Sequence, residues 1–201
     1  MRTAFLKVVR PEQMKNGAEF TDEAEEDIID AGMVFSAESK ATEYLSRAEQ
    51  CRFNLTQKLL KKKYERKYIE RALDYLEEKN YLNDRRFALS WLHARSINHA
   101  EGRTKLLAEL LSRGISKEDS NSALDAFFAE HSEEAVCEKA FGRFLRRGKT
   151  GDALFRAMMC AGFPYALVRR IVKEAENGNS FSADFIEPDR EMPDSEAAPV
   201  P

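Results

Sequence analysis

The feature that most constrains the fold is an internal repeat through the middle of the chain. Three passages align without gaps: LTQKLLKKKYERKYIERALDYL from Leu55, LLAELLSRGISKEDSNSALDAF from Leu106 and LFRAMMCAGFPYALVRRIVKEA from Leu154. The aligned apolar positions are Leu59, Leu110 and Met158, then Tyr64, Ile115 and Phe163, then Leu73, Leu124 and Val172. The offsets of 51 and 48 residues are typical of tandem helical arrays. Because one such unit is small for a stable core, neighbouring units should stack on each other.

Apolar residues recur at intervals of three and four within each unit, which predicts three helices per unit. We therefore expect an all-α fold, a tandem array of three helix-turn-helix-like repeats that forms an elongated curved rod. The repeats are expected at 38–82, 83–130 and 131–176, with helices near 37–49, 52–62, 65–79, 84–97, 102–112, 116–129, 132–147, 151–161 and 164–176. Six aromatic residues are candidates for packing between units, although ordinary core packing is the preferred interpretation: Phe87, Trp91, Phe127, Phe128, Phe141 and Phe144.

A tight turn joins the second and third helix of each repeat. Gly114 and Gly162 stand at this turn in the second and third repeats, where a helix end favours the left-handed conformation that glycine adopts freely. Lys63 takes the aligned position in the first repeat, so we expect a strained or lengthened turn there.

The two ends of the chain are acidic and less regular. In the N-terminal segment, 1–37, TAFLKVV is compatible with a short strand, and TDEAEEDIIDAG is typical of a capped acidic helix that ends at Gly32. The C-terminal segment, 177–201, is acidic, holds four of the six prolines and lacks a helical period, which predicts a disordered tail.

Charge is distributed unevenly along the chain. The net charge is −3, yet residues 38–176 hold 27 Lys and Arg against 21 Asp and Glu. A basic body between acidic ends favours a polyanionic partner, although ordinary charge scatter would give a similar pattern.

Two groups of basic residues are the candidate binding sites, for phosphates or for acidic protein surfaces. The first is centred on KLLKKKYERK and the second surrounds RRGK; the alternative for each is a solvated helix face. The candidates are Arg52, Lys58, Lys61, Lys62, Lys63, Arg66, Lys67 and Arg71 in the first group, and Arg143, Arg146, Arg147, Lys149, Arg169 and Arg170 in the second.

No residue pattern indicates catalysis, a cofactor or a metal site. Three dispersed cysteines, Cys51, Cys137 and Cys160, lack metal-ligand spacing and suit a reduced, cytoplasmic protein. The histidines His93, His99 and His131 also lack ligand spacing and a nucleophilic partner. RRGKTGD at 146–152 lacks the first glycine of a phosphate-binding loop, and we expect Thr150 to cap the following helix. No segment is long and apolar enough to span a membrane.

The most specific signature is NYLNDRRFALSWLHAR at 80–95, where Asn83 is expected to cap a helix. Together with the repeat, it resembles the RecX family of recombination regulators over about 38–176. The matching residues are Leu82, Asp84, Arg86, Phe87 and Ala88, then Leu45, Ser46, Arg47 and Glu49, then Leu106, Glu109, Leu110, Gly114 and Ile115. Cys51 and Asn54 replace the Ser and Glu of the family's usual capping box, and the head lacks the strands that many members have.

The resemblance implies a regulator without enzymatic activity. It implies binding within the groove of the RecA–DNA filament, with contact to single-stranded DNA through the filament. It also implies reduced ATPase, strand-exchange and co-protease activity of RecA in DNA repair, recombination and the SOS response. We expect a monomer.

Two alternatives stay open: a protein that binds DNA directly through its helix-turn-helix-like units, and a plain helical scaffold. The third helices begin RKYIER, KEDSNS and YALVRR. This difference in charge argues against three equivalent DNA-reading helices.

Overall fold

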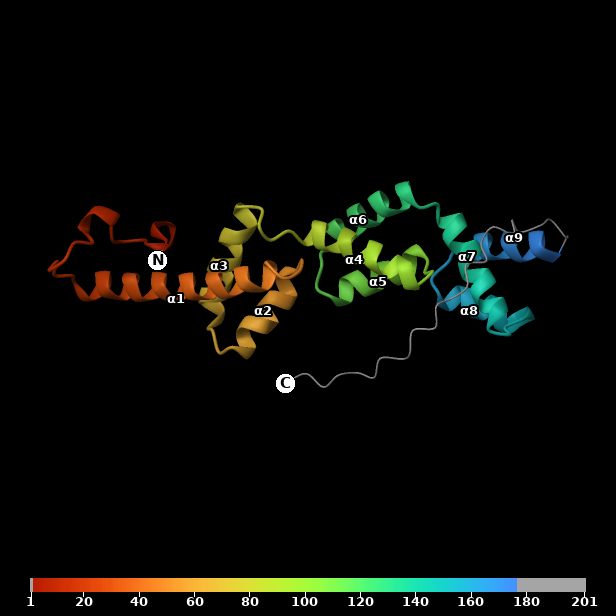
Figure 1. Cartoon of the computed structure of the whole chain (residues 1–201), viewed down its shortest axis with the longest axis horizontal. Helices are drawn as coiled ribbons and strands as arrows, with labels where there is room; N and C mark the ends of the chain where they lie inside the picture. Colours follow the sequence, from red (N-terminus) through yellow and green to blue (C-terminus); the bar gives the residue numbers. More distant parts are fainter. Residues whose placement is uncertain (1, 177–201) are drawn as a thin grey trace.

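The computed structural model describes residues 2–176, and within them it contains nine α-helices and no β-strand. The helices follow one another along a long, narrow molecule, three to a unit (Figure 1). The first unit holds α1 (Asp22–Leu45), α2 (Arg52–Lys61) and α3 (Arg66–Glu78), the second holds α4 (Asp84–Asn98), α5 (Arg103–Ser112) and α6 (Lys117–Glu130), and the third holds α7 (Glu133–Arg146), α8 (Gly151–Cys160) and α9 (Tyr165–Glu176). The predicted all-α array of three-helix repeats is confirmed. The predicted disordered tail, 177–201, lies outside the described residues.

Each unit encloses a hydrophobic core of its own. The aligned residues Leu59, Leu110 and Met158 are completely buried, one in each core, which is why the sequence repeats an apolar residue at that position. The cores are built around Leu55, Ile69 and Leu73 in the first unit, Leu106, Leu124 and Phe127 in the second, and Leu154, Val168 and Ile171 in the third.

The first helix is longer than its counterparts and begins earlier than the sequence predicts. Thr21 caps α1 by accepting a hydrogen bond from the backbone N–H of Ala24, and acidic residues fill its first turn. The prediction of a helix ending at Gly32 was wrong, because α1 continues through that residue to Leu45. A stripe of buried alanines along α1 packs on α3 across this glycine and holds the two halves as one helix. Within residues 2–176, no helix combines the length and the apolar character needed to cross a bilayer.

The segment before α1 packs on the first unit without forming a strand among the described residues. Instead it contains two short 3-10 helices, Thr3–Phe5 and Pro11–Gln13. Asp27, in α1, fixes this segment by accepting hydrogen bonds from the backbone N–H groups of Lys7, Val8 and Val9, at 2.8–3.1 Å from its nearer oxygen. Three donors on one carboxylate satisfy backbone groups that a strand ladder would otherwise pair.

The turn between the second and third helix has the same backbone in all three units. The φ angles are +66° at Lys63, +76° at Gly114 and +87° at Gly162. The first turn is therefore not lengthened, and the strain expected there is the left-handed conformation of a lysine.

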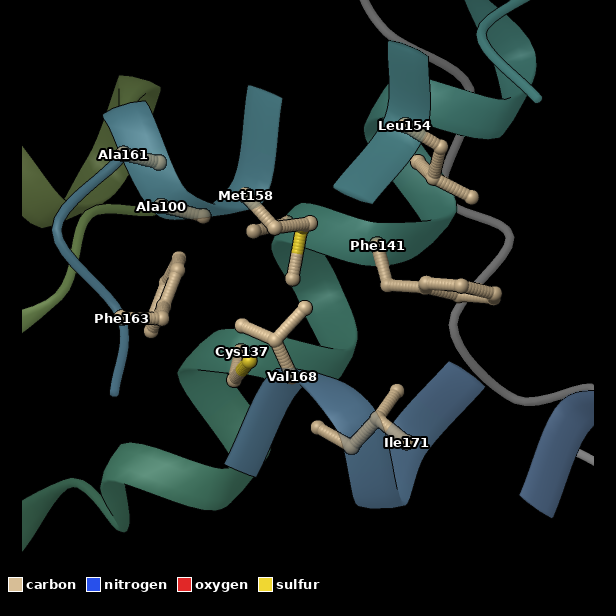
Figure 2. Packing of buried hydrophobic residues seen from close by; sticks show 10 residues of the cluster. Ala100, Cys137, Phe141, Leu154, Met158, Ala161, Phe163, Val168 and Ile171 are labelled. Atoms are coloured by element: carbon tan, nitrogen blue, oxygen red, sulfur yellow. The ribbon is translucent and has the colours of Figure 1, made fainter. Parts of the chain in front are cut away.

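In the first and second units, a residue just before the second helix reaches into the core of the next unit. Cys51, which precedes α2, is completely buried in the second core, and Ala100, which precedes α5, lies in the third. Figure 2 shows Ala100 beside Ala161, with Met158 and Phe163 nearby. The units are therefore joined by shared hydrophobic cores.

The contact regions between adjacent units, which we call seams, also repeat their hydrogen bonds. The backbone N–H of Arg52 donates to Asp84 at 2.7 Å, and the backbone N–H of Arg103 donates to Glu133 at 3.2 Å. In both cases the first acidic residue of one unit satisfies an unpaired N–H at a helix start in the unit before it. The array thus repeats the contacts between units as well as the units themselves.

Candidate basic interaction surface

Three consecutive lysines at the α2–α3 turn form the most available part of the first basic group. Lys61 ends α2, Lys62 follows it, and Lys63 takes the left-handed conformation that reverses the chain. All three side chains are exposed, and none forms a hydrogen bond or ion pair with another residue of the described range 2–176. We refer to Lys61, Lys62 and Lys63 as the turn lysines.

Most other members of the first group are held by neighbouring side chains. Hydrogen bonds with Tyr68 and with Asp30 raise the pKa of Lys67 to about 12, which reflects a cation with partners already in place. Lys58 lies against Gln50 and the ring of Tyr44, Arg66 against Glu70, Lys67 against Asp30 and the ring of Tyr68, and Arg71 against the carbonyl oxygen of Phe5.

Arg52 has a structural part within its own unit. Its guanidinium contacts Asp74 at 2.7 Å and Glu77 at 2.6 Å. The second unit repeats the first of these pairs at an offset of 51 residues, where Arg103 contacts Asp125 at 2.7 Å. A pair that recurs in register serves the fold of the unit, so Arg52 is the weakest binding candidate of its group.

The second basic group divides in the same way. Arg143 donates to the carbonyl oxygen of Asn98 at 2.8 Å, and Arg170 pairs with Glu134. Arg146, Arg147, Lys149 and Arg169 are exposed and have no hydrogen bond or ion pair within residues 2–176, although Lys149 lies 5.3 Å from the centre of the Phe144 ring. Arg146, Arg147 and Lys149 surround the turn between α7 and α8.

The two available groups lie in different units of the elongated molecule. In Figure 1 the α2–α3 turn of the first unit and the α7–α8 turn of the third unit both lie along the lower edge. A partner that carries negative charge along its length could contact both turns at once.

The cysteine chemistry gives no sign of a nucleophile. Burial raises the pKa of the Cys137 thiol to about 12 and also raises that of Cys51, so both stay protonated at neutral pH. Cys160 is exposed. Thr150 stands at the start of α8, but its side chain accepts no capping hydrogen bond, contrary to the sequence prediction.

Comparison with known proteins gives the chain its family. Residues 83–124 match the family model of the second three-helix domain of RecX. The chain is 35% identical to the regulatory protein RecX of Treponema pallidum (strain Nichols) over 162 residues, which are 81% of this chain and 99% of that protein. The chain belongs to the RecX family. It is therefore a regulatory protein and not an enzyme.

More distant relatives agree. RecX of Ralstonia pickettii (strain 12J) is 32% identical over 148 residues, which cover 70% of this chain and 89% of that protein. A crystal structure of regulatory protein RecX has a TM-score of 0.71 at 20% identity. The match covers 81% of this chain and 83% of the chain in that structure. The crystal structure of RecX from Lactobacillus salivarius has a TM-score of 0.64 at 18% identity. The match covers 73% of this chain and 99% of that chain. The structural matches support the fold.

The RecX motif residues hold the first seam of the array. Asn83 caps α4 by accepting from the backbone N–H of Arg86, as predicted. Arg86 contacts Glu49 at 2.6 Å, which joins the motif at 80–95 to the one that begins at Leu45. Leu82 is buried in the first core. The signature that identifies the family therefore encodes a joint between units.

The sequence places the basic residues in two groups but does not show which of them are already paired in the fold. One signal was available, since Arg52 and Asp74 align with Arg103 and Asp125 at the repeat offset. Contacts such as Arg71 with Phe5 join residues that are 66 positions apart, and no repeat links them.

Proposed function

We propose that this protein acts in the cytoplasm, as a monomer, by binding the RecA–DNA filament through the turn lysines and reducing RecA's activity in DNA repair, recombination and the SOS response. The observation that carries the proposal is that the turn lysines form a compact cationic group whose side chains make no hydrogen bond or ion pair within residues 2–176. Such a group can meet phosphates or carboxylates without first breaking an ion pair. Membership of the RecX family supports RecA as the partner.

The exposed residues of the third unit provide a second contact on the same filament. Arg146, Arg147, Lys149 and Arg169 lie two units away from the turn lysines along the rod. Two weak contacts joined by a stiff connection bind more tightly than either does alone, provided that the partner spans both. A filament meets that condition, whereas a short oligonucleotide does not.

The decisive experiment measures ATP hydrolysis by RecA on single-stranded DNA while the protein is added up to equimolar amounts. The wild-type protein should suppress hydrolysis. The triple variant Lys61→Glu, Lys62→Glu, Lys63→Glu should need on the order of 10-fold more protein for the same effect, because three cationic contacts become repulsive. A wild-type protein without any effect on RecA would rule out the proposed function.

A matched control separates the position of the charges from their number. Lys7, Lys15 and Lys117 are exposed lysines outside both basic groups, and their reversal to Glu gives the same change in net charge. This control should inhibit RecA like the wild type, and circular dichroism should show equal helix content in all three proteins. Equal loss in both triple variants would mean that only net charge matters.

Binding to naked DNA tests the main alternative. The protein should prefer the filament to the same single-stranded DNA without RecA. The reverse preference would favour direct DNA binding. The second unit argues against that alternative, because the first turn of α6 contains Glu118 and Asp119, which repel phosphates.

A further inference from the structure

Two imidazoles and a carboxylate meet where α4 passes the end of α6. His93 belongs to α4, Glu130 is the last residue of α6, and His131 follows it. One ligand atom from each residue lies within 4.8 Å of the other two, and His93 Nε2 is 3.7 Å from a Glu130 oxygen. Spacing along the chain does not reveal this cluster, because His93 is remote in sequence from the other two residues.

A buried aromatic ring holds both imidazoles in place. Phe127 is only 2% exposed, and its ring centre lies 5.5 Å from that of His93 and 4.8 Å from that of His131. The two imidazole centres are 5.8 Å apart. This packing limits ring rotation, so less conformational entropy is lost when a ligand fixes the rings.

The ligand atoms are open to solvent and free of strong competing partners. Apart from the contact between His93 and Glu130, none of the three side chains forms a hydrogen bond or ion pair with another residue of the range 2–176. The His93 side chain is 39% exposed and that of Glu130 is 59% exposed. Zinc bonds of 2.0–2.1 Å place tetrahedral ligand atoms roughly 3.3 Å apart, so small side-chain rotations would close the site.

We propose that His93, Glu130 and His131 bind one transition-metal ion, with Zn²⁺ as the best fit and water in the remaining position. Two imidazoles and one carboxylate suit Zn²⁺, whereas Mg²⁺ and Ca²⁺ prefer oxygen ligands alone. The cluster lies on an open surface next to a buried ring, and we assign the metal a role in the fold because of where the three ligands lie.

The position of the cluster determines what the metal does. Only His131 and Ser132 separate α6 from α7, so this junction connects the second unit to the third. Coordination by His93 ties the junction to α4 and resists fraying at the end of α6. Metal binding therefore stiffens the joint between two units, independently of any contact with RecA.

Titration calorimetry of the full chain with ZnCl₂ tests the proposal. The exposed thiol is removed first by Cys160→Ser, so that it cannot act as a zinc ligand. In this background one Zn²⁺ should bind per chain. His93→Ala and His131→Ala should each weaken binding by at least about 10-fold, since even outer-shell partners of a metal site contribute that much.

The third histidine provides the matched control. His99 lies outside the cluster, so His99→Ala should bind Zn²⁺ like its parent. Co²⁺ should give visible absorption bands of a four- or five-coordinate site in the parent and in His99→Ala, but not in His93→Ala. Circular dichroism should confirm equal helix content in all variants.

Two results would overturn the proposal. One is the absence of both binding heat and a cobalt spectrum in the parent. The other is equal loss of zinc affinity in His99→Ala and His93→Ala, which would mean that zinc binds histidines without using this cluster. If His93→Ala lost helix content, His93→Gln would replace it, since glutamine keeps similar bulk without the imidazole.

Discussion

At the scale of single residues, the turn at Lys63 shows what glycine does elsewhere in the array. An alanine Cβ at Gly114 would lie 2.7 Å from the Phe53 side chain, and one at Gly162 would lie 2.5 Å from the backbone nitrogen of Lys105. Both contacts come from the preceding unit. The turn at Lys63 belongs to the first unit of the range 2–176, so this residue needs only to adopt the left-handed conformation, which costs about 1–2 kcal/mol.

Substitutions at the turns should separate backbone strain from the clash between units. Gly162→Ala introduces both, so its free energy of unfolding should fall by at least about 2 kcal/mol. Gly148→Ala is the matched control, because Gly148 also has a positive φ, +73°, but a methyl group added there would meet no atom within 4 Å. Gly148→Ala should therefore lower the free energy of unfolding by only about 1 kcal/mol.

Lys63→Gly completes this series and should raise the free energy of unfolding by up to about 1 kcal/mol, because it relieves strain. Urea denaturation followed by circular dichroism measures all three variants. Equal losses for Gly162→Ala and Gly148→Ala would show that the seam does not require glycine.

At the scale of elements, α1 differs from α4 and α7 because it also anchors the segment before it. Asp27 is 7% exposed and accepts three backbone N–H groups. Burial alone would raise the pKa of this carboxyl, but the backbone hydrogen bonds outweigh burial and lower it. The anchor therefore depends on a charged carboxylate.

The N-terminal segment should detach in acid. The lowered pKa of Asp27 means that the folded protein binds this proton less readily than the unfolded chain, whose Asp pKa is about 3.9. The stabilisation is thus fully present above about pH 4 and is lost as the pH falls through the lower, folded-state pKa. Hydrogen exchange at the amides of Lys7, Val8 and Val9 should accelerate, relative to the intrinsic rate, over this range.

Asp27→Asn provides the comparison for that measurement. An amide is uncharged and carries an NH2 group in place of one oxygen, so its remaining oxygen accepts the three N–H groups more weakly, and the contact of the second oxygen with the Lys7 N–H is lost. The variant should therefore lose about 1–3 kcal/mol of local stability at pH 7. Its remaining protection should not change as the pH falls below about 4, the range in which the wild-type carboxylate titrates. Full protection in the variant at pH 7 would contradict the role of the carboxylate.

At the scale of the whole molecule, the protein is a row of cores joined by seams. Units of such an array pack on their neighbours, as in other repeat proteins, so stability should vary from unit to unit along the chain. Ala100 and Cys51 couple adjacent cores, because each belongs to one unit by sequence and to the next by packing.

A core cavity in the third unit should therefore have a graded effect. Met158 is completely buried, and Met158→Ala should cost about 2–5 kcal/mol within the third unit. Hydrogen exchange should show the largest loss of protection in α7–α9, a smaller loss in α4–α6 through Ala100, and almost none in α1–α3. A uniform loss across all nine helices of the range 2–176 would mean that the molecule unfolds as a single unit.

The sequence alone was sufficient to predict the three units, but it was insufficient for the N-terminal segment and the extent of α1. Period, apolar register and turn residues are local properties, so they determined three three-helix repeats, and the motif at 80–95 carried the resemblance to the family. The predicted extent of α1 was wrong because the buried alanines of this helix pack on α3. A helix end predicted from Gly32 alone does not include that tertiary contact. The segment before α1 was ambiguous because Asp27, not a strand partner, satisfies its backbone.

The basic residues show the same division. The sequence determined that KLLKKKYERK is cationic, but it could not determine which charges are available. The repeat register signals the pairing of Arg52, but only the tertiary structure separated the turn lysines from Lys67 and Arg71. Lys67 pairs with Asp30, and Arg71 donates to the Phe5 carbonyl oxygen, and both partners are remote along the chain. Composition determines how many charged residues the surface carries, and packing determines which of them remain available to a binding partner.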